Sequence, residues 1–264
     1  MKEKAKILVY VLIPTFFYIF FGMIISLTAY AFGNELISDN AGHISMIISA
    51  FCSALFAQKL SGIKLKDRTD LRKVKILPLT AILMIGYAID QIIQFGSGNI
   101  LSRITSAPEN MSANETVFSI IGAVLIAPVC EEIIFRFSSI EISKNEFSAP
   151  LMVIANGIFF ALLHPYNIQG FLTTFSFGII TAIIYIYSHK LIYCIALHAF
   201  CNFMSVLVPT EKIMFGGQPI QSVVNGFGVC SYIWIIVNAL ILAIGIVIFG
   251  GYKRSDKVST AEKQ

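Results

Sequence analysis

Apolar residues occupy long, nearly uninterrupted runs of the chain, and polar residues gather between the runs. A hydrocarbon core about 30 Å thick is crossed by about 20 apolar residues in a helix, so each run is a candidate membrane span. Eight runs qualify, at approximately residues 7–32, 43–60, 77–96, 115–143, 149–165, 168–188, 190–208 and 229–250. The pattern therefore predicts an all-α fold, a polytopic membrane helix bundle of about eight transmembrane helices.

Composition supports a lipid bilayer as the surroundings. Hydrophobic residues make up 56% of the chain and charged residues 13%, about half the charged fraction of a soluble domain. The run at 7–32 is too long for the apolar region of a signal peptide, which has about 7–15 residues. We expect one integral membrane domain over residues 1–264, and the net charge of +4 gives no indication of a nucleic-acid partner.

Basic residues are distributed unevenly between the two sides that eight spans would define. If the N-terminus is cytoplasmic, all but Arg103 and Lys212 of the 19 Lys and Arg residues fall on the cytoplasmic side or near it. Cytoplasmic loops of membrane proteins carry such an excess of positive charge. The sequence therefore predicts that both termini are cytoplasmic.

A few ionisable residues interrupt the spans, and each charge near the bilayer centre costs about 2.5–3.5 kcal/mol. They must therefore face the interior of the bundle, where they can be paired or hydrated. Asp90, in the outer part of its span, is interpreted as a carboxylate near a helix end. The others are Glu131, Glu132, Arg136, His164 and His198.

Helical spacing separates the two glutamates of the segment CEEIIFRF at 130–137. Arg136 follows Glu132 by four residues, so the two share a helix face and are expected to form a structural ion pair. Glu131 points about 100° away from Glu132 because a helical turn holds 3.6 residues. That carboxylate needs another partner and is the candidate functional residue.

Two later helices bring polar residues to a similar depth. With a turn near 144–148, Glu131 and His164 both lie roughly 20–25 Å from that turn, so they can meet across a helical hairpin. Phe160 shares a helix face with His164, and His198 shares one with Asn202, because each pair is four residues apart. We expect Glu131, His164, His198 and Asn202 to converge in one layer.

This constellation suits hydrolysis of an amide. Glu131 and His164 can activate a water molecule as a general base, and His198 with Asn202 can donate hydrogen bonds to a developing oxyanion. A catalytic zinc ion held by Glu131, His164 and His198 is the alternative use of the same residues. The H-E-x-x-H helix signature is absent, which favours hydrolysis without a metal.

Three motifs in this order resemble the CPBP family of intramembrane proteases: EEIIFR as EExxxR, FALLH as FxxxH, and HAFCN as HxxxN. The family includes type II CAAX prenyl endopeptidases and bacteriocin-processing and self-immunity proteins. The resemblance covers about 115–208. It implies catalytic Glu131, His164, His198 and Asn202, supported by Glu132, Arg136 and Phe160.

The resemblance also implies a substrate class and a location. The substrate would be a peptide or a lipid-anchored protein, and the location a bacterial cell membrane. Members of the family are often described as metalloendopeptidases, so zinc or another divalent metal is the cofactor to test. The alternative function is a non-catalytic protein, a bacteriocin self-immunity factor or a membrane scaffold, that uses the same pocket for recognition.

Overall fold

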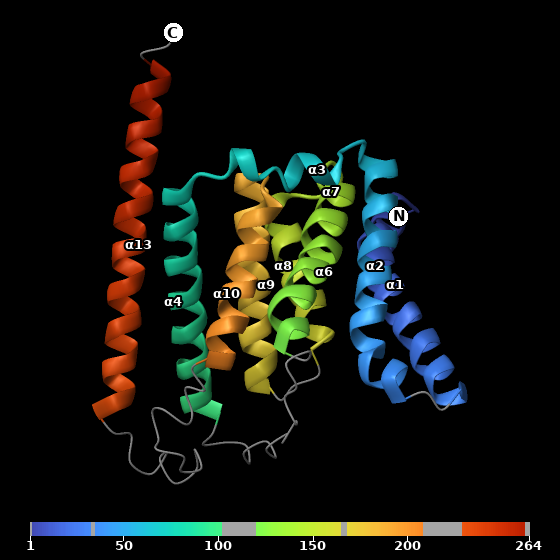
Figure 1. Cartoon of the computed structure of the whole chain (residues 1–264). Helices are drawn as coiled ribbons and strands as arrows, with labels where there is room; N and C mark the ends of the chain where they lie inside the picture. The colour runs from blue at the N-terminus through green and yellow to red at the C-terminus, as the bar shows by residue number, and fades with distance from the viewer. Residues whose placement is uncertain (1, 33–34, 102–119, 165–167, 208–228, 262–264) are drawn as a thin grey trace.

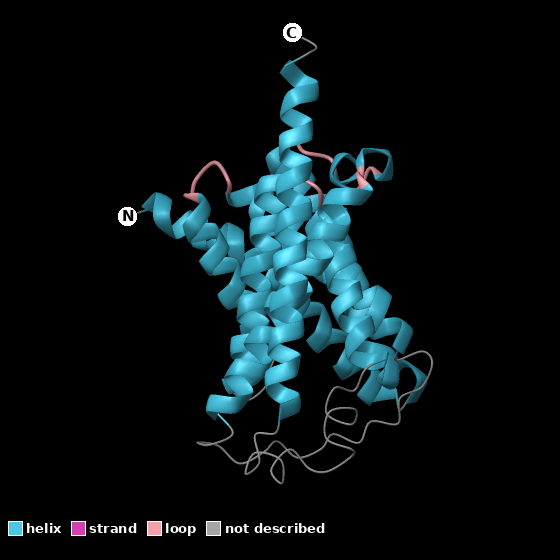
Figure 2. Cartoon of the chain, turned by 90° about the vertical axis from the view of Figure 1, so that its left-hand side faces the viewer, coloured by secondary structure: helices cyan, strands magenta, loops and turns pink. Residues whose placement is uncertain are grey.

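The structure is a computed structural model that describes residues 2–32, 35–101, 120–164, 168–207 and 229–261. These residues form helices joined by short turns, and they contain no strand (Figures 1 and 2). The predicted all-α class is confirmed. The elements are α1 (Lys2–Phe32), α2 (Glu35–Ser61), α3 (Leu65–Arg68), the 3₁₀-helix η1 (Leu71–Lys73), α4 (Ile76–Leu101), the π-helix η2 (Gly122–Ile126), α6 (Ala127–Glu132), the π-helix η3 (Ile133–Ser138), α7 (Ser139–Ser143), α8 (Ala149–Leu162), α9 (Ile168–Ser188), α10 (Leu191–Leu207) and α13 (Val229–Ala261).

Five stretches are long and apolar enough to cross a membrane: Leu12–Phe32, Ala41–Ser61, Ile76–Gln94, Gly170–Ser188 and Trp234–Gly251. α8 and α10 are apolar but shorter, and the 14 residues of α8 extend only about 21 Å at 1.5 Å per residue. The run predicted at 115–143 is divided, where it is described, among four short segments. A membrane helix bundle is therefore supported, whereas eight full-length spans are not confirmed.

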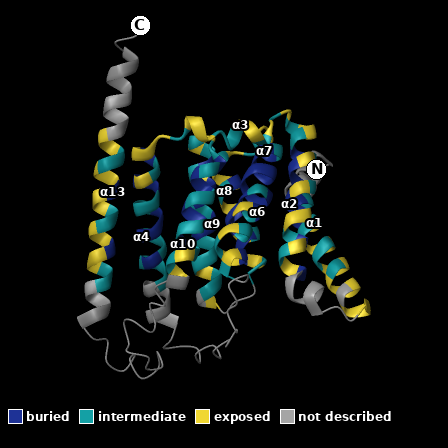
Figure 3. Cartoon of the chain, viewed as in Figure 1, coloured by how far each residue is buried: buried dark blue, intermediate teal, exposed yellow. Residues whose placement is uncertain are grey.

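Two helix pairs flank a central group of helices (Figure 1). α1 packs along α2, α4 packs along α13, and α8 packs against α9. Buried residues concentrate in the central group, and exposed positions cover the outer helices (Figure 3). Many exposed side chains are large and apolar, such as Val247 of α13, which is 73% exposed. Soluble proteins rarely expose such extensive apolar surface, so these faces are suited to lipid.

The basic linker after α2 lies at one end of the bundle. α3, α7 and the C-terminal end of α13 are found together at this end (Figure 1). The carboxylate of Glu141 in α7 is buried and accepts hydrogen bonds from Arg68 Nε at 2.7 Å, Lys144 Nζ at 2.6 Å and the Tyr185 hydroxyl at 2.7 Å. This network fixes the linker to α7 and α9. That this end faces the cytoplasm stays a prediction.

The helix that carries the two glutamates is π-helical on both sides of α6. Its wider turns leave room for side chains to reach the backbone. The Ser138 hydroxyl donates to the Ile133 carbonyl five residues earlier at 2.8 Å, and Asn156 Nδ2 of α8 donates to the Phe135 carbonyl at 2.5 Å. π-helical turns are rare in proteins and occur often at functional sites. The local backbone around Glu131 therefore differs from a regular α-helix.

Candidate active site

Glu131 lies in the last turn of α6, and its side chain is only 12% exposed. Its Oε2 atom is 3.6 Å from His164 Nε2 and 3.9 Å from His198 Nε2. His164 directly follows α8, and His198 lies in α10. The structure thus brings together the three side chains that depth and spacing predicted to converge.

In each imidazole, the hydrogen bond made by Nδ1 determines whether Nε2 is a donor or an acceptor. His164 Nδ1 lies 2.7 Å from the Phe160 carbonyl oxygen, and His198 Nδ1 lies 2.9 Å from Glu132 Oε1. A carbonyl or a carboxylate oxygen can only accept, so Nδ1 is the donor in both rings. Each neutral ring therefore carries its lone pair on Nε2, the atom nearest Glu131.

Three acceptor atoms consequently surround one point: Glu131 Oε2 and the Nε2 atoms of His164 and His198. Glu131 Oε2 is buried and has no hydrogen-bond donor among the described residues. A buried carboxylate oxygen without a donor is costly. The geometry therefore favours a small ligand that donates protons to these atoms, and water is the simplest one.

Glu132 and Arg136 form the expected ion pair. Arg136 Nε is 3.2 Å from Glu132 Oε2, and both side chains are completely buried. The contact is electrostatic, because Arg136 Nε makes no hydrogen bond to a described residue. Glu132 uses its other oxygen to accept from His198 Nδ1. One buried carboxylate thus links the arginine to the imidazole.

The guanidinium of Arg136 is held by a second helix as well. Its Nη2 donates to the Thr181 hydroxyl and, at 3.4 Å, to the Gly178 carbonyl, both in α9. The guanidinium carbon also lies 4.5 Å from the centre of the Phe160 ring, a cation–π distance. The sequence did not predict Thr181, because an isolated threonine in an apolar helix carries no distinctive signal.

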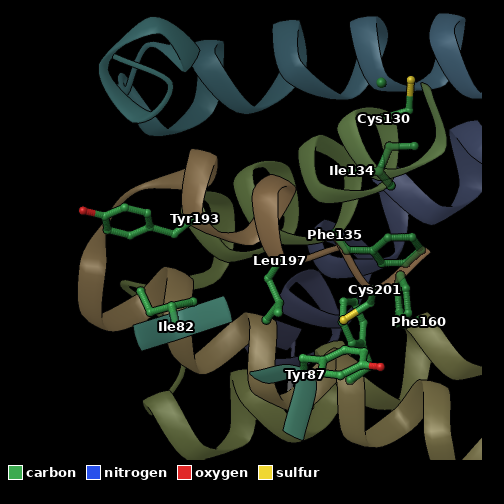
Figure 4. Packing of buried hydrophobic residues seen from close by; sticks show 11 residues of the cluster. Ile82, Tyr87, Cys130, Ile134, Phe135, Phe160, Tyr193, Leu197 and Cys201 are labelled. Atoms are coloured by element: carbon green, nitrogen blue, oxygen red, sulfur yellow. The ribbon is translucent and has the colours of Figure 1, made fainter. Parts of the chain in front are cut away.

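Phe160 connects the imidazoles with the apolar core. Its ring centre is 4.5 Å from that of His164 and 5.9 Å from that of His198. Phe135 meets it edge to face at 5.2 Å, and the two rings lie side by side in Figure 4. Phe160 therefore restricts where both imidazoles can lie, which is the geometry expected of a supporting residue.

Asn202 contacts the π-helical segment η2 rather than a catalytic side chain. Ala127 N–H donates to the Gly122 carbonyl five residues earlier, and the next bond of that pattern would join residue 128 to Ala123. Pro128 has no N–H, so that bond cannot form. Asn202 Nδ2 donates to the Ala123 carbonyl instead, at 2.8 Å. This bond fixes the carboxamide and occupies one of its two N–H groups.

These residues line one cavity of about 460 Å³. Glu131, His164, His198 and Asn202 all contribute to its wall, together with aromatic residues such as Phe177. A cavity that combines aromatic and apolar walls with convergent polar groups is typical of a small-molecule or peptide site. The cavity is therefore the candidate active site.

Comparison with known families identifies this part of the chain. Residues 113–204 of the 264 match the sequence model of a family described as "Type II CAAX prenyl endopeptidase Rce1-like". This segment is similar to the Rce1-like family. Comparison with curated proteins and with solved structures gives no significant match. The match confirms the resemblance to CPBP proteases that the three motifs indicated.

The Rce1-like segment contains all seven residues that the sequence assigned to the site, from Glu131 to Asn202. The family is one of proteases, which supports peptidase activity and a membrane location for this chain. The matched segment includes three of the four cavity residues of α10, and helices outside the segment complete the cavity. These include α1, through Tyr18, and α4, through Asp90.

Asp90, interpreted as a helix-end or interfacial carboxylate, lies four residues before the end of the candidate span Ile76–Gln94. It lies within α4, which continues to Leu101, and its side chain lines the cavity. Its Oδ2 accepts one long hydrogen bond, from Gln91 Nε2 at 3.4 Å. The position of Asp90 inside a span could have indicated a role in the site, because a carboxylate inside a span is a functional candidate by default.

A metal ion is the cofactor that the family and the donor set suggest. In the described part of the chain, no group of three or more His, Cys, Asp or Glu side chains is arranged to hold a metal ion. The separations of 3.6 and 3.9 Å between Glu131 and the imidazoles exceed the roughly 3.4 Å between tetrahedral zinc ligands about 2.1 Å from the ion. The residues as placed do not fit a metal, and no catalytic step is derived through one.

Proposed function

We propose that the chain is an intramembrane endopeptidase that hydrolyses a peptide or lipid-modified protein substrate with a water activated by Glu131 and His164. One observation carries the proposal: three acceptor atoms, from Glu131, His164 and His198, surround one point in a buried cavity. A water at that point can donate its protons to two of these atoms. Its oxygen lone pairs then remain available to attack a carbonyl carbon.

In the first step a bond forms between the water oxygen and the carbonyl carbon of the scissile amide. Glu131 removes a proton from the water, and His164 accepts the second hydrogen bond, which orients the oxygen. The Phe160 carbonyl fixes the His164 ring through Nδ1. The electron pair of the carbonyl bond moves to its oxygen, which becomes an oxyanion.

Donors for that oxyanion come from α10. Asn202 keeps one N–H beyond its bond to Ala123, and His198 Nε2, an acceptor in the neutral ring, donates once the ring has taken up a proton from solvent. Glu132 accepts from His198 Nδ1 and therefore stabilises the imidazolium. Because His198 is largely buried, its hydrogen bond contributes more than it would in solution.

Collapse of the tetrahedral intermediate breaks the carbon–nitrogen bond. The proton held by Glu131 passes to the leaving nitrogen, so the products are a carboxylic acid, which keeps the second proton of the water, and an amine. Glu132 and Arg136 touch no reacting atom in this scheme. They are positioning residues, because they act through His198.

The purified chain, reconstituted in lipid vesicles, tests the proposal with a panel of apolar peptides and mass spectrometry of the products. The wild type should cleave at least one peptide, and Glu131→Gln should lose cleavage by about a thousandfold or more. Glu146→Gln is the matched control, since Glu146 lies in an exposed turn outside the cavity. Full activity of Glu131→Gln would refute the assignment. Binding without cleavage by the wild type would favour the non-catalytic alternative.

A further inference from the structure

Asp90 is the one carboxylate of the cavity wall that the proposed reaction does not use. We propose that it anchors a subsite for a cationic group of the substrate, the ammonium of a lysine or the guanidinium of an arginine near the scissile bond. The inference rests on the proposed function, because it concerns the substrate of the same cavity. It identifies a class of substrate that the family match does not specify.

The first reason is that the carboxylate lacks a cation. Gln91 Nε2 is its single hydrogen-bond donor in the structure, at 3.4 Å, which is near the limit of a hydrogen bond. No described Lys or Arg lies within 4 Å of Asp90 or lines the cavity. A carboxylate inside a membrane bundle is stabilised most by an opposite charge. The substrate can supply that charge.

The second reason is the hydrogen-bonding character of the neighbouring wall. The Thr174 hydroxyl donates to the Gly170 carbonyl at 2.8 Å, and the Ser205 hydroxyl donates to the Cys201 carbonyl at 3.0 Å. Residues Thr174 and Ser205 line the cavity, and each hydroxyl already donates its single proton to a carbonyl of its own helix. They can offer the cavity only oxygen lone pairs.

Asp90 and these two hydroxyls therefore present acceptors to the cavity. An ammonium has three N–H donors and a guanidinium has five, and neither has an acceptor. Such a group complements a carboxylate and hydroxyl oxygens, whereas a carboxylate of the substrate would be repelled. Apolar residues of the same wall, Leu163 and Phe177, can pack against the methylene stem of a lysine or an arginine.

Binding is measured separately from cleavage so that the two proposals can fail independently. The probe is an apolar nine-residue peptide in which one position at a time holds Lys, norleucine or Glu. Its affinity is measured with Glu131→Gln in lipid vesicles, with and without Asp90→Asn. Asp70→Asn is the control, because Asp70 is a carboxylate of the linker outside the cavity. Cleavage of the same peptides is measured with the wild type and with Asp90→Asn.

At one position, Lys should bind about tenfold to a hundredfold more tightly than its isostere norleucine, the range for a hydrogen bond to a charged group. Asp90→Asn should abolish this preference, and Asp70→Asn should preserve it. Equal affinity for the three peptides at every position, or a preference that survives Asp90→Asn, would overturn the subsite. A preference that depends on Asp90 without any cleavage would instead refute the peptidase proposal and leave the subsite standing.

Discussion

Adjacent glutamates in this chain occupy opposite electrostatic environments. Glu132 is completely buried between Arg136 and His198, so its charge is matched inside the protein. Glu131 faces the cavity and has no described hydrogen-bond donor at Oε2. Both placements follow from residue spacing: four residues join Glu132 to Arg136, and one residue turns Glu131 away. The roles of the seven assigned residues in catalysis stay predictions.

The buried ion pair allows a prediction that separates stability from activity. Arg136→Met should lower the free energy of unfolding by about 3–5 kcal/mol, because it leaves the charge of Glu132 buried and unpaired. Adding Glu132→Gln should recover most of that loss, since the carboxamide oxygen still accepts from His198. Cleavage should stay low in both variants: Arg136→Met removes the cation that positions Glu132, and Glu132→Gln also removes the anionic partner of the imidazolium. Denaturant titration in mixed micelles, followed by circular dichroism, measures the first effect. An Arg136→Met protein as stable as the wild type would contradict the account.

At the scale of elements, the π-helical segments around α6 are the main feature that the sequence did not predict. The run at 120–143 is apolar on most sides, so its hydrophobic pattern carries no period that could distinguish a π-turn from an α-turn. The consequence of Pro128 also depends on a distant residue, because Asn202 lies 79 positions from Ala123 along the chain. Local sequence cannot reveal such a pairing.

The hydrogen bond between Asn202 and Ala123 predicts that a second substitution can restore stability without restoring cleavage. Asn202→Ala should lower both stability and cleavage, since Ala123 loses its donor. Adding Pro128→Ala supplies a backbone N–H that can bond to the Ala123 carbonyl, which should recover about 1 kcal/mol of stability. Cleavage should not recover, because the oxyanion donor is still missing. Thermal unfolding and product formation measured on the same samples check both parts. Recovery of cleavage in the double variant would make Asn202 a purely structural residue.

At the scale of the molecule, the cavity is assembled from elements distributed over most of the chain. Depth arguments predicted that α6, α8 and α10 meet, because Glu131, His164 and His198 lie at similar distances from the same end of the bundle along their helices. They could not place α4 beside the site, so they did not predict that Asp90 lines the cavity. The predicted count of about eight spans is not confirmed, since α8 and α10 are apolar but shorter than a full span.

The separations between Glu131 and the two imidazoles predict the response to metal removal. Cleavage should persist after exhaustive treatment with 1,10-phenanthroline or EDTA, because no described group of three ligands is arranged around a metal. Metal content measured on the same preparation should not correlate with the rate. Loss of cleavage on chelation, with recovery on addition of zinc, would show that the cavity rearranges to hold the ion.

The central claim is that water attacks the substrate directly and that Glu131 is its base. Single-turnover cleavage in ¹⁸O-labelled water, with enzyme in excess over peptide, tests this most directly by mass spectrometry. The account predicts one ¹⁸O atom in the new carboxylate of the product from the first turnover, and no product from Glu131→Gln. An unlabelled product in the first turnover, with the label in Glu131 instead, would contradict it, because the carboxylate would then be a nucleophile.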